Sequence, residues 1–441
     1  MVLTGRAGLL ALLGVIPIAL APAPGPVFLV LLAAGVVLVA VDVALAADVR
    51  AVRLTRSGDD AARLGQPVAA VLTVHNSGRR RIRGRIRDAW PPSGRGTPLS
   101  HPLNLAARQQ MSVSTRLHPV RRGDLRSAAV TVRAVGPLGL AGRQGRHRVP
   151  GTVRILPPFL SRRHLPSRLA RLRELEGATP ALIRGQGTEF DSLREYVAGD
   201  DVRSIDWRAT ARRGDVVVRT WRPERDQRIV IVLDTGRTSA GRVGVDPTGS
   251  DPATGWPRLD WSMDAALLLA ALAVRAGDRV DFLAHDRTMR TAVFDATRTD
   301  LLAHLVNAMA PLKPALVETD STAMVSAIQR RARRRALVVV LTDLNTSALD
   351  EGLLRVLPQL AGRHHVLIAA VSDPRVDVLA SGRGDAAAVY DAAAAERSRT
   401  DRRAIAARLR GGGVEVVDAE PQRLAPALAD HYLALKATGR W

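Results

Sequence analysis

Residues 27–47 form an apolar stretch interrupted only by Asp42, and this stretch limits the fold more than any other feature of the chain. A bilayer span needs about 20 apolar residues, so the segment is long enough to cross a membrane. Residues 7–24 are also apolar and uncharged, with Pro17 inside them, and a Pro-rich turn at 21–26 joins the two stretches. We therefore expect two transmembrane helices in residues 1–48. A signal peptide is the alternative for the first stretch.

Positive charge sets the expected orientation of this hairpin. Arg6 precedes the first span, the turn has no Lys or Arg, and the arginines after the second span are Arg50, Arg53 and Arg56. Basic residues favour the cytoplasmic side, so we expect a multi-pass protein of the inner membrane with both ends in the cytoplasm. Asp42 is then an interfacial carboxylate near the cytoplasmic end, or alternatively a functional group inside the membrane.

Composition excludes several classes of site and leaves the origin of the charge open. The 441 residues contain no cysteine, which excludes disulfides, thiolate metal sites and a cysteine nucleophile. The formal net charge of +22 fits nucleic-acid binding, contact with anionic lipid, or a solvated surface. No nucleic-acid-binding motif accompanies the charge, so we expect the membrane as a partner rather than nucleic acid.

Residues 49–158 show short alternating runs separated by turn signals, without long helical periodicity. The expected strands lie at 68–74, 80–87, 112–117 and 127–135. Together they predict a small antiparallel β-sandwich. Arginine alternates with isoleucine or glycine in the second of these strands, whose basic face could meet lipid headgroups, RNA or solvent. Beyond this domain, residues 161–175 predict a basic linker helix.

Residues 159–227 connect this domain to the next, and acids and arginines alternate there around three aromatic residues. Arginine–carboxylate pairs are strong when they are bidentate, so we expect an ion-paired structural plug, with a docking surface as the alternative. No nucleophile stands beside a base in this segment, so it predicts no catalysis. The residues of this signature are Gly187, Glu189, Phe190, Arg194, Tyr196, Gly199, Asp200, Arg203, Asp206, Trp207 and Arg212.

The run G-x-E-F-x-x-L-R-x-Y-x-x-G-D-D-x-R-x-I-D-W-x-x-x-A-R resembles the signature of the bacterial "domain of unknown function 58" family. The resemblance extends in outline over the whole chain: two spans, a β-rich segment, the signature and a von Willebrand factor A-like domain. It implies a gene neighbourhood with a MoxR-type AAA+ ATPase and, in some operons, with transglutaminase-like membrane proteins. The biochemical role of the family is poorly defined.

Residues 228–441 alternate strands with helices, which predicts an α/β domain with a doubly wound, Rossmann-like sheet. The expected strands are 228–233, 280–284, 336–341, 366–371 and 414–417. The expected helices are 262–276, 299–309, 322–334, 349–361, 386–409 and one from residue 421. Ligands of such sheets bind at the C-terminal ends of the strands. His364 and His365 begin a strand, and we expect them at the surface.

Two expected strand ends carry an acid, Asp234 and Asp343. They resemble the metal-ion-dependent adhesion site of von Willebrand A domains, whose first element is D-x-S-x-S. The match is degenerate, because Gly236 replaces the first hydroxyl, and Thr322 is an alternative third element. The other interpretation is that both acids cap loops and helices. The resemblance implies that Mg²⁺, which prefers oxygen ligands, is held by Asp234, Thr238, Thr319 and Asp343.

The sequence favours a binding protein over an enzyme. It has no G-x-x-x-x-G-K-[ST] loop, no H-E-x-x-H and no G-x-S-x-G, and we expect no nucleotide cofactor. We expect a membrane-anchored protein-binding module or scaffold. The family resemblance implies a MoxR-type AAA+ ATPase as its partner, in envelope complex assembly or stress response. A metal-independent structural scaffold and a basic nucleic-acid-binding protein are the alternatives.

Overall fold

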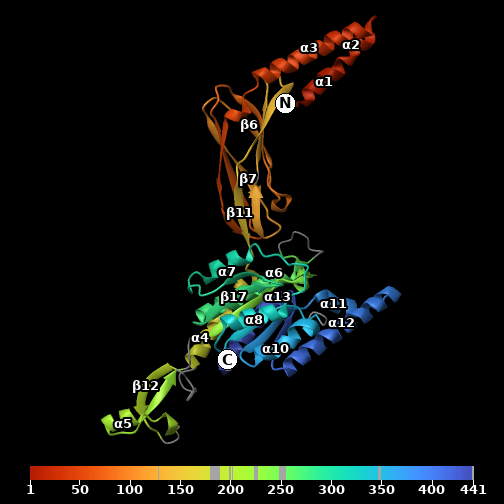
Figure 1. Cartoon of the computed structure of the whole chain (residues 1–441). Helices are drawn as coiled ribbons and strands as arrows, with labels where there is room; N and C mark the ends of the chain where they lie inside the picture. The colour runs from red at the N-terminus through yellow and green to blue at the C-terminus, as the bar shows by residue number, and fades with distance from the viewer. Residues whose placement is uncertain are drawn as a thin grey trace. The chain divides into compact units, whose positions relative to one another are not determined.

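The computed structural model describes residues 1–127, 129–178, 189–197, 200, 202–222, 227–247, 255–345 and 349–439. The chain has a mixed α/β fold and divides into two compact units, Met1–Leu156 and Pro157–Trp441. Figure 1 shows helices α1–α3 and a set of long strands in the first unit, and a sheet with flanking helices in the second.

The first unit begins with apolar helices. These are α1 (Gly5–Leu13), α2 (Val15–Leu20) and α3 (Pro24–Leu45), and α3 starts with prolines in its first turn, where no backbone N–H is lost from the helix. In the part of the chain that the structure describes, one helical stretch, Pro24–Ala51, is long and apolar enough to cross a membrane. The apolar helical stretch Gly5–Leu20 is shorter.

A β-sandwich follows, and it buries apolar side chains between two antiparallel sheets. One sheet has the order β1 (Val2–Leu3), β10 (Ala141–His147), β9 (Val130–Val135), β5 (Ile82–Asp88), β6 (Ser100–Leu105). The facing sheet has the order β2 (Val52–Gly58), β4 (Val68–Asn76), β7 (Gln110–Leu117). Ile86 and Val132 from the first sheet share one core with Leu72 and Val74 from the second.

A third sheet departs from the purely antiparallel arrangement that the sequence predicted. Its order is β3 (Ala61–Arg63), β11 (Gly151–Leu156), β8 (Gly123–Ser127), and the β3–β11 pair is parallel. The alternation predicted for the arginine-rich strand is confirmed. In β5, Ile82 and Ile86 are buried, whereas Arg83, Arg85 and Arg87 are exposed on the other face.

Asp42 joins α3 to the sandwich. Its side chain is fully buried, and its carboxylate accepts hydrogen bonds from the backbone N–H groups of Leu138 (2.8 Å), Leu140 (2.7 Å) and Ala141 (2.8 Å). Gly136 makes this approach possible, because a Cβ atom there would lie 2.2 Å from Asp42 Oδ1. Asp42 is therefore a structural carboxylate that fixes the end of the apolar helix to the β9–β10 turn.

The second unit is built on a six-stranded sheet. Its order is β18 (Met289–Val293), β17 (Arg279–His285), β14 (Arg228–Asp234), β19 (Leu337–Leu341), β20 (His365–Val371), β21 (Glu415–Ala419). All neighbouring pairs are parallel except β17–β18. In β14 every residue after Arg228 is buried, and all of these except the terminal Asp234 are apolar.

Helices cover both faces of this sheet (Figure 1). Helices α6 (Arg258–Arg275) and α13 (Pro421–Thr438) pack together on one face, with α7 (Leu301–Met309) beside α6. The other face packs against α8 (Ser321–Arg331), α10 (Leu354–Ala361) and the end of α12 (Ala386–Gly411). The short helix α11 (Pro374–Ala380) packs against α12.

Several sequence predictions need correction. Edge strand β18, helix α11 and the hairpin of β12 (Glu189–Glu195) and β13 (Val217–Arg222) were not predicted. The linker begins with the 3₁₀ helix η3 (Leu160–His164), followed by α4 (Leu165–Ala178). The prediction that His364 and His365 lie at the surface is wrong, because β20 is an internal strand. The first is 4% exposed, and the second contacts Glu415 at 3.1 Å.

Candidate functional site

The strand order brings two predicted site residues to one edge of the sheet. Asp234 is the last residue of β14. The neighbouring strand β19 ends at Leu341, and Thr342 and then Asp343 follow it. The chain leaves β14 towards α6 and β17, and leaves β19 towards α10 and β20, so the two connections diverge. Such a point of divergence forms the crevice where open α/β sheets bind ligands.

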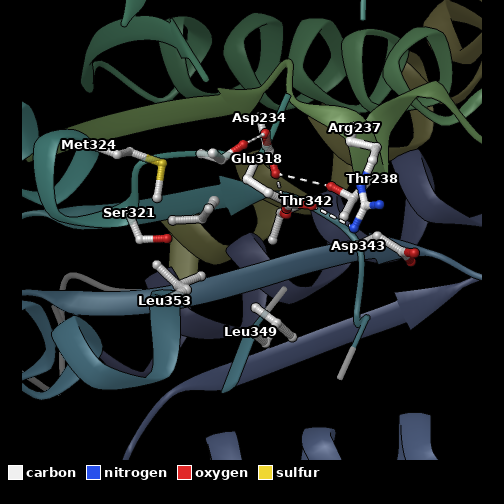
Figure 2. Close-up of a pocket in the computed structure, with 12 residues that line it drawn as sticks. Asp234, Arg237, Thr238, Glu318, Ser321, Met324, Thr342, Asp343, Leu349 and Leu353 are labelled. Carbon is white, nitrogen blue, oxygen red and sulfur yellow. Dashed lines mark hydrogen bonds and ion pairs between the residues drawn. The ribbon is translucent and has the colours of Figure 1, made fainter. Parts of the chain in front are cut away.

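Four donors enclose the carboxylate of Asp234, which is 5% exposed. Figure 2 shows Asp234 with Thr238 and Thr342 beside it. Oδ1 accepts hydrogen bonds from the N–H of Gly236 (2.8 Å) and from Oγ1 of Thr319 (2.6 Å). Oδ2 accepts from Oγ1 of Thr342 (2.7 Å) and from Oγ1 of Thr238 (3.3 Å). We call these four donors and Asp234 the hydroxyl cage.

The cage resolves which threonine pairs with the first acid. Thr319 reaches Asp234, whereas Asp320 accepts a hydrogen bond from the N–H of Ala323 (2.9 Å) and caps α8. Gly236 is not merely a missing hydroxyl: a Cβ atom there would lie 2.2 Å from Oγ1 of Thr319. The Thr319 hydroxyl therefore uses the space that a side chain at residue 236 would need.

Asp343 contacts two arginines, Arg258 and Arg402. Its carboxylate points away from Asp234 (Figure 2). Its Oδ1 accepts a hydrogen bond from Nη1 of Arg402 (2.7 Å), and its Oδ2 lies 3.3 Å from Nη1 of Arg258. Arg402 also donates to both oxygens of Asp418, at 2.7 and 2.8 Å. Burial opposes the charged form of Arg402, but Asp418 and Asp343 outweigh this effect and raise the pKa of the guanidinium.

Both acids line a small cavity of about 30 Å³. Its polar lining includes the hydroxyls of the cage and Ser321, and its apolar lining is Met324, Val340, Leu349 and Leu353. At its rim Arg237 and Glu318 form an ion pair of 2.5 Å, with exposed side-chain fractions of 61% and 54%. The cavity holds a water-sized group, and the ion pair at its rim is open to larger partners.

The signature segment forms an ion-paired hairpin around β12 and β13. Arg194 Nη2 contacts Asp200 Oδ1 at 2.5 Å, and Asp206 accepts from Arg219 Nε at 2.7 Å. Asp206 also caps α5 (Trp207–Arg213), and the N–H of Ala209 and then Arg219 lower the pKa of its carboxyl. These pairs agree with the prediction of an ion-paired segment.

Two aromatic residues of the predicted plug, Tyr196 and Trp207, are not buried. Trp207 is 68% exposed and Tyr196 is 36% exposed, which favours the docking alternative for this face. Arg203 lies on the 3₁₀ helix η5 (Val202–Ser204), and Arg212 is exposed on α5. Glu189 and Phe190 belong to β12. Gly187 and Gly199 lie outside the described residues.

Residues 192–411 match the family "Protein of unknown function DUF58". This DUF58 segment contains the signature from Ser192 onward, the hydroxyl cage and Arg402. The match agrees with the family resemblance that the signature indicated.

Three similar proteins carry the description "uncharacterized". The uncharacterized proteins Mb1516 of Mycobacterium bovis and Rv1480 of Mycobacterium tuberculosis are each 29% identical over 204 residues, which is 46% of this chain and 60% of the relative. The chain thus spans about three fifths of the length of these relatives. YeaD of Bacillus subtilis is 23% identical over 32% of this chain and 36% of its own.

A solved structure, the PilB minor pilin from Streptococcus sanguinis, is 8% identical and covers 81% of this chain and 89% of its own. Its TM-score of 0.34 is too low to support a shared fold.

The carboxylate oxygens of Asp234 and Asp343 do not fit the coordination of a resident Mg²⁺ ion. Mg²⁺ needs oxygen ligands that are free to coordinate in near-octahedral geometry. Asp343 directs both oxygens to arginines, and the oxygens of Asp234 accept four hydrogen bonds. No group of three or more Asp, Glu or His side chains in the described ranges is arranged to hold a metal ion.

Proposed function

We propose that the DUF58 segment is a von Willebrand factor A-like module that binds a protein partner at the C-terminal edge of its sheet, and that a membrane helix anchors it. The observation that carries the proposal is the hydroxyl cage. It places a buried carboxylate and three threonine hydroxyls at the crevice between β14 and β19, beside an exposed ion pair. Crevices of this kind are the usual ligand sites of open α/β sheets.

The strand order supports the proposed kinship with von Willebrand A domains. The connections after β14 and after β19 run to opposite sides of the sheet. The antiparallel strand β18 lies at its edge. The first strand ends in an acid followed by a hydroxyl four residues later, Asp234 and Thr238, which is the spacing of the adhesion-site pattern.

A binding role suits the chemistry of this site better than catalysis. Each carboxylate of the site already accepts a hydrogen bond or forms an ion pair. Among the described residues that line the cavity, no nucleophile stands beside an unpaired base. The solvent-exposed group at the rim is the Arg237–Glu318 ion pair. A charged residue of a partner can replace one member of this pair.

The membrane part of the proposal places α3 across the inner membrane, with the helical stretch Gly5–Leu20 as a second span. The mean hydropathy of α3 and its exposed side chains support the span, and the positions of Arg6 and Arg50 support a cytoplasmic location for both ends. The soluble units would then meet a cytoplasmic partner. The family resemblance makes a MoxR-type AAA+ ATPase the partner to test, in envelope complex assembly or stress response.

The test is a binding measurement between the full-length protein in lipid nanodiscs and the MoxR-type ATPase of the same organism. The variant Arg237→Glu reverses an exposed charge at the rim without touching the core. We expect it to weaken binding by at least about tenfold, the size typical of a charge reversal against a complementary partner. Arg330→Glu is the matched control, because Arg330 is exposed at the far end of α8.

Equal affinities of the native protein and Arg237→Glu would remove this edge of the sheet from the proposal. Loss of binding in both variants would indicate a general charge effect instead of a defined site.

A further inference from the structure

Arg402 binds Asp343, the second acid of the predicted adhesion site. It projects from α12 and bridges two acids, Asp343 after β19 and Asp418 in β21. Three of its contacts are 2.7–2.8 Å, and its side chain is 18% exposed. A guanidinium in this geometry donates to two carboxylates at once, as a bridging metal ion would accept from them.

Arg258 completes the arrangement from the opposite side. It begins α6, and its Nη1 lies 3.3 Å from Asp343 Oδ2 with the side chain 21% exposed. Two guanidinium charges therefore face one carboxylate that is 8% exposed. A divalent cation placed beside Asp343 would meet their repulsion in a poorly solvated site, where such repulsion is strong.

The carboxylate of Asp234 in the hydroxyl cage likewise needs no metal ion to satisfy its oxygens. Four donors point at the two oxygens of Asp234, so its lone pairs are used by groups of this chain. The Thr319 hydroxyl fills the space beside Gly236 from which another hydroxyl would reach a metal. Both acids of the site are thus satisfied by the protein itself.

We propose that this site works without a divalent cation, and that Arg402 with Arg258 replaces the ion by holding Asp343 and Asp418 in place. Metal independence is a property of the site itself, whereas the role of the site in partner binding rests on the proposed function. Partner contacts are then made directly by side chains at the rim, not through a shared metal ion. Arg402 is a positioning residue that also holds α12 against the ends of β19 and β21.

The first test is a titration of the full-length protein in nanodiscs with MgCl₂, and separately with MnCl₂, followed by calorimetry. We expect no saturable binding up to millimolar concentrations and no change in Tm on addition of EDTA. Because a ligand that binds only the folded state must raise Tm, the two readouts are independent checks. Saturable binding that disappears in Asp234→Ala would overturn the proposal.

The second test asks whether removing the arginine creates a metal site. Arg402→Ala frees Oδ1 of Asp343 and both oxygens of Asp418, so we expect saturable Mn²⁺ binding that the native protein lacks. Mn²⁺ should also restore part of the Tm that the variant loses. Arg399→Ala is the matched control, because Arg399 lies on the same helix and pairs with Asp377 and Glu396 instead.

The same Mn²⁺ titration in the native protein, Arg402→Ala and Arg399→Ala would refute the role of Arg402. The native titration decides metal independence even if Arg402→Ala does not fold. No partner protein is present in either experiment, so failure of the proposed partner leaves both results interpretable.

Discussion

Asp42 shows how one carboxylate can be tolerated at the end of an apolar helix. Its charge is balanced by three backbone donors of a tight turn instead of by a cation. Buried charges persist only when such hydrogen bonds compensate the loss of water. The residue therefore links the membrane-spanning candidate α3 to the sandwich, and a proton-carrying role in the membrane is not needed to explain it.

Replacing Asp42 with Ala should release the β9–β10 turn. Each buried N–H left without an acceptor costs about 1–3 kcal/mol, so exchange of the Leu138, Leu140 and Ala141 amides should become at least about tenfold faster. Hydrogen exchange of the full-length protein in nanodiscs measures this directly. Asp48→Ala is the control, because Asp48 is exposed and caps only Arg50. Unchanged exchange in Asp42→Ala would contradict the structural role.

The candidate site was predictable from sequence only where its chemistry lies along the chain. Asp234 and Thr238 stand in one short motif after a buried strand, so their proximity follows from the pattern. Thr342 and Arg402 carried no such signal. Their bonds join residues 108 and 59 positions apart, to Asp234 and to Asp343 respectively. Only the strand order brings these partners together.

At the scale of elements, burial decides which strands the sequence predicts. β14, β19 and β20 are apolar and largely β-branched because helices cover both their faces. β18 has the sequence MRTAV and no fully buried residue, since it pairs with one neighbour at the edge. The hairpin of β12 and β13 was hidden for a different reason: its charged residues satisfy each other locally, which gives no apolar periodicity.

The contact between η3 and α6 carries a pH-dependent group. Asp264 on α6 is 5% exposed, and its carboxylate accepts hydrogen bonds from the N–H of Ser161 at 3.1 and 3.2 Å. Burial raises the pKa of Asp264 to about 6, although the hydrogen bonds from Ser161 partly oppose the shift. The folded state therefore binds this proton more tightly than the unfolded state, whose pKa is near 3.8.

Stability should accordingly fall as pH rises from about 4 to about 6, and the cost of the ionised carboxylate is fully present above that window. The shift corresponds to at most about 3 kcal/mol. We expect the Tm of the native protein to rise relative to Asp264→Asn when the pH is lowered from 7.5 to 5. Asp401→Asn, at an exposed position of α12, should not change its offset from the native Tm. A pH-independent offset for Asp264→Asn would contradict the raised pKa.

At the scale of the whole molecule, charge is distributed unevenly between the two units. Residues 1–156 contain 22 arginines and 6 acidic residues, so this unit carries +16 of the net charge of +22. Anionic lipids attract basic residues at the cytoplasmic surface of a membrane. The unit that contains α3 is thus the one whose charge suits a membrane surface, which supports the proposed orientation.

The absence of cysteine allows a clean test of that orientation. Ala23→Cys places a thiol in the exposed turn between α2 and α3, and Ser114→Cys places one at an exposed position of β7. If residues 1–48 form a hairpin with both ends in the cytoplasm, a membrane-impermeant maleimide should label Ala23→Cys in intact cells, and Ser114→Cys only after the cells are opened. Labelling in the reverse order would invert the orientation. Protection of both thiols in intact cells would remove the external turn from the proposal.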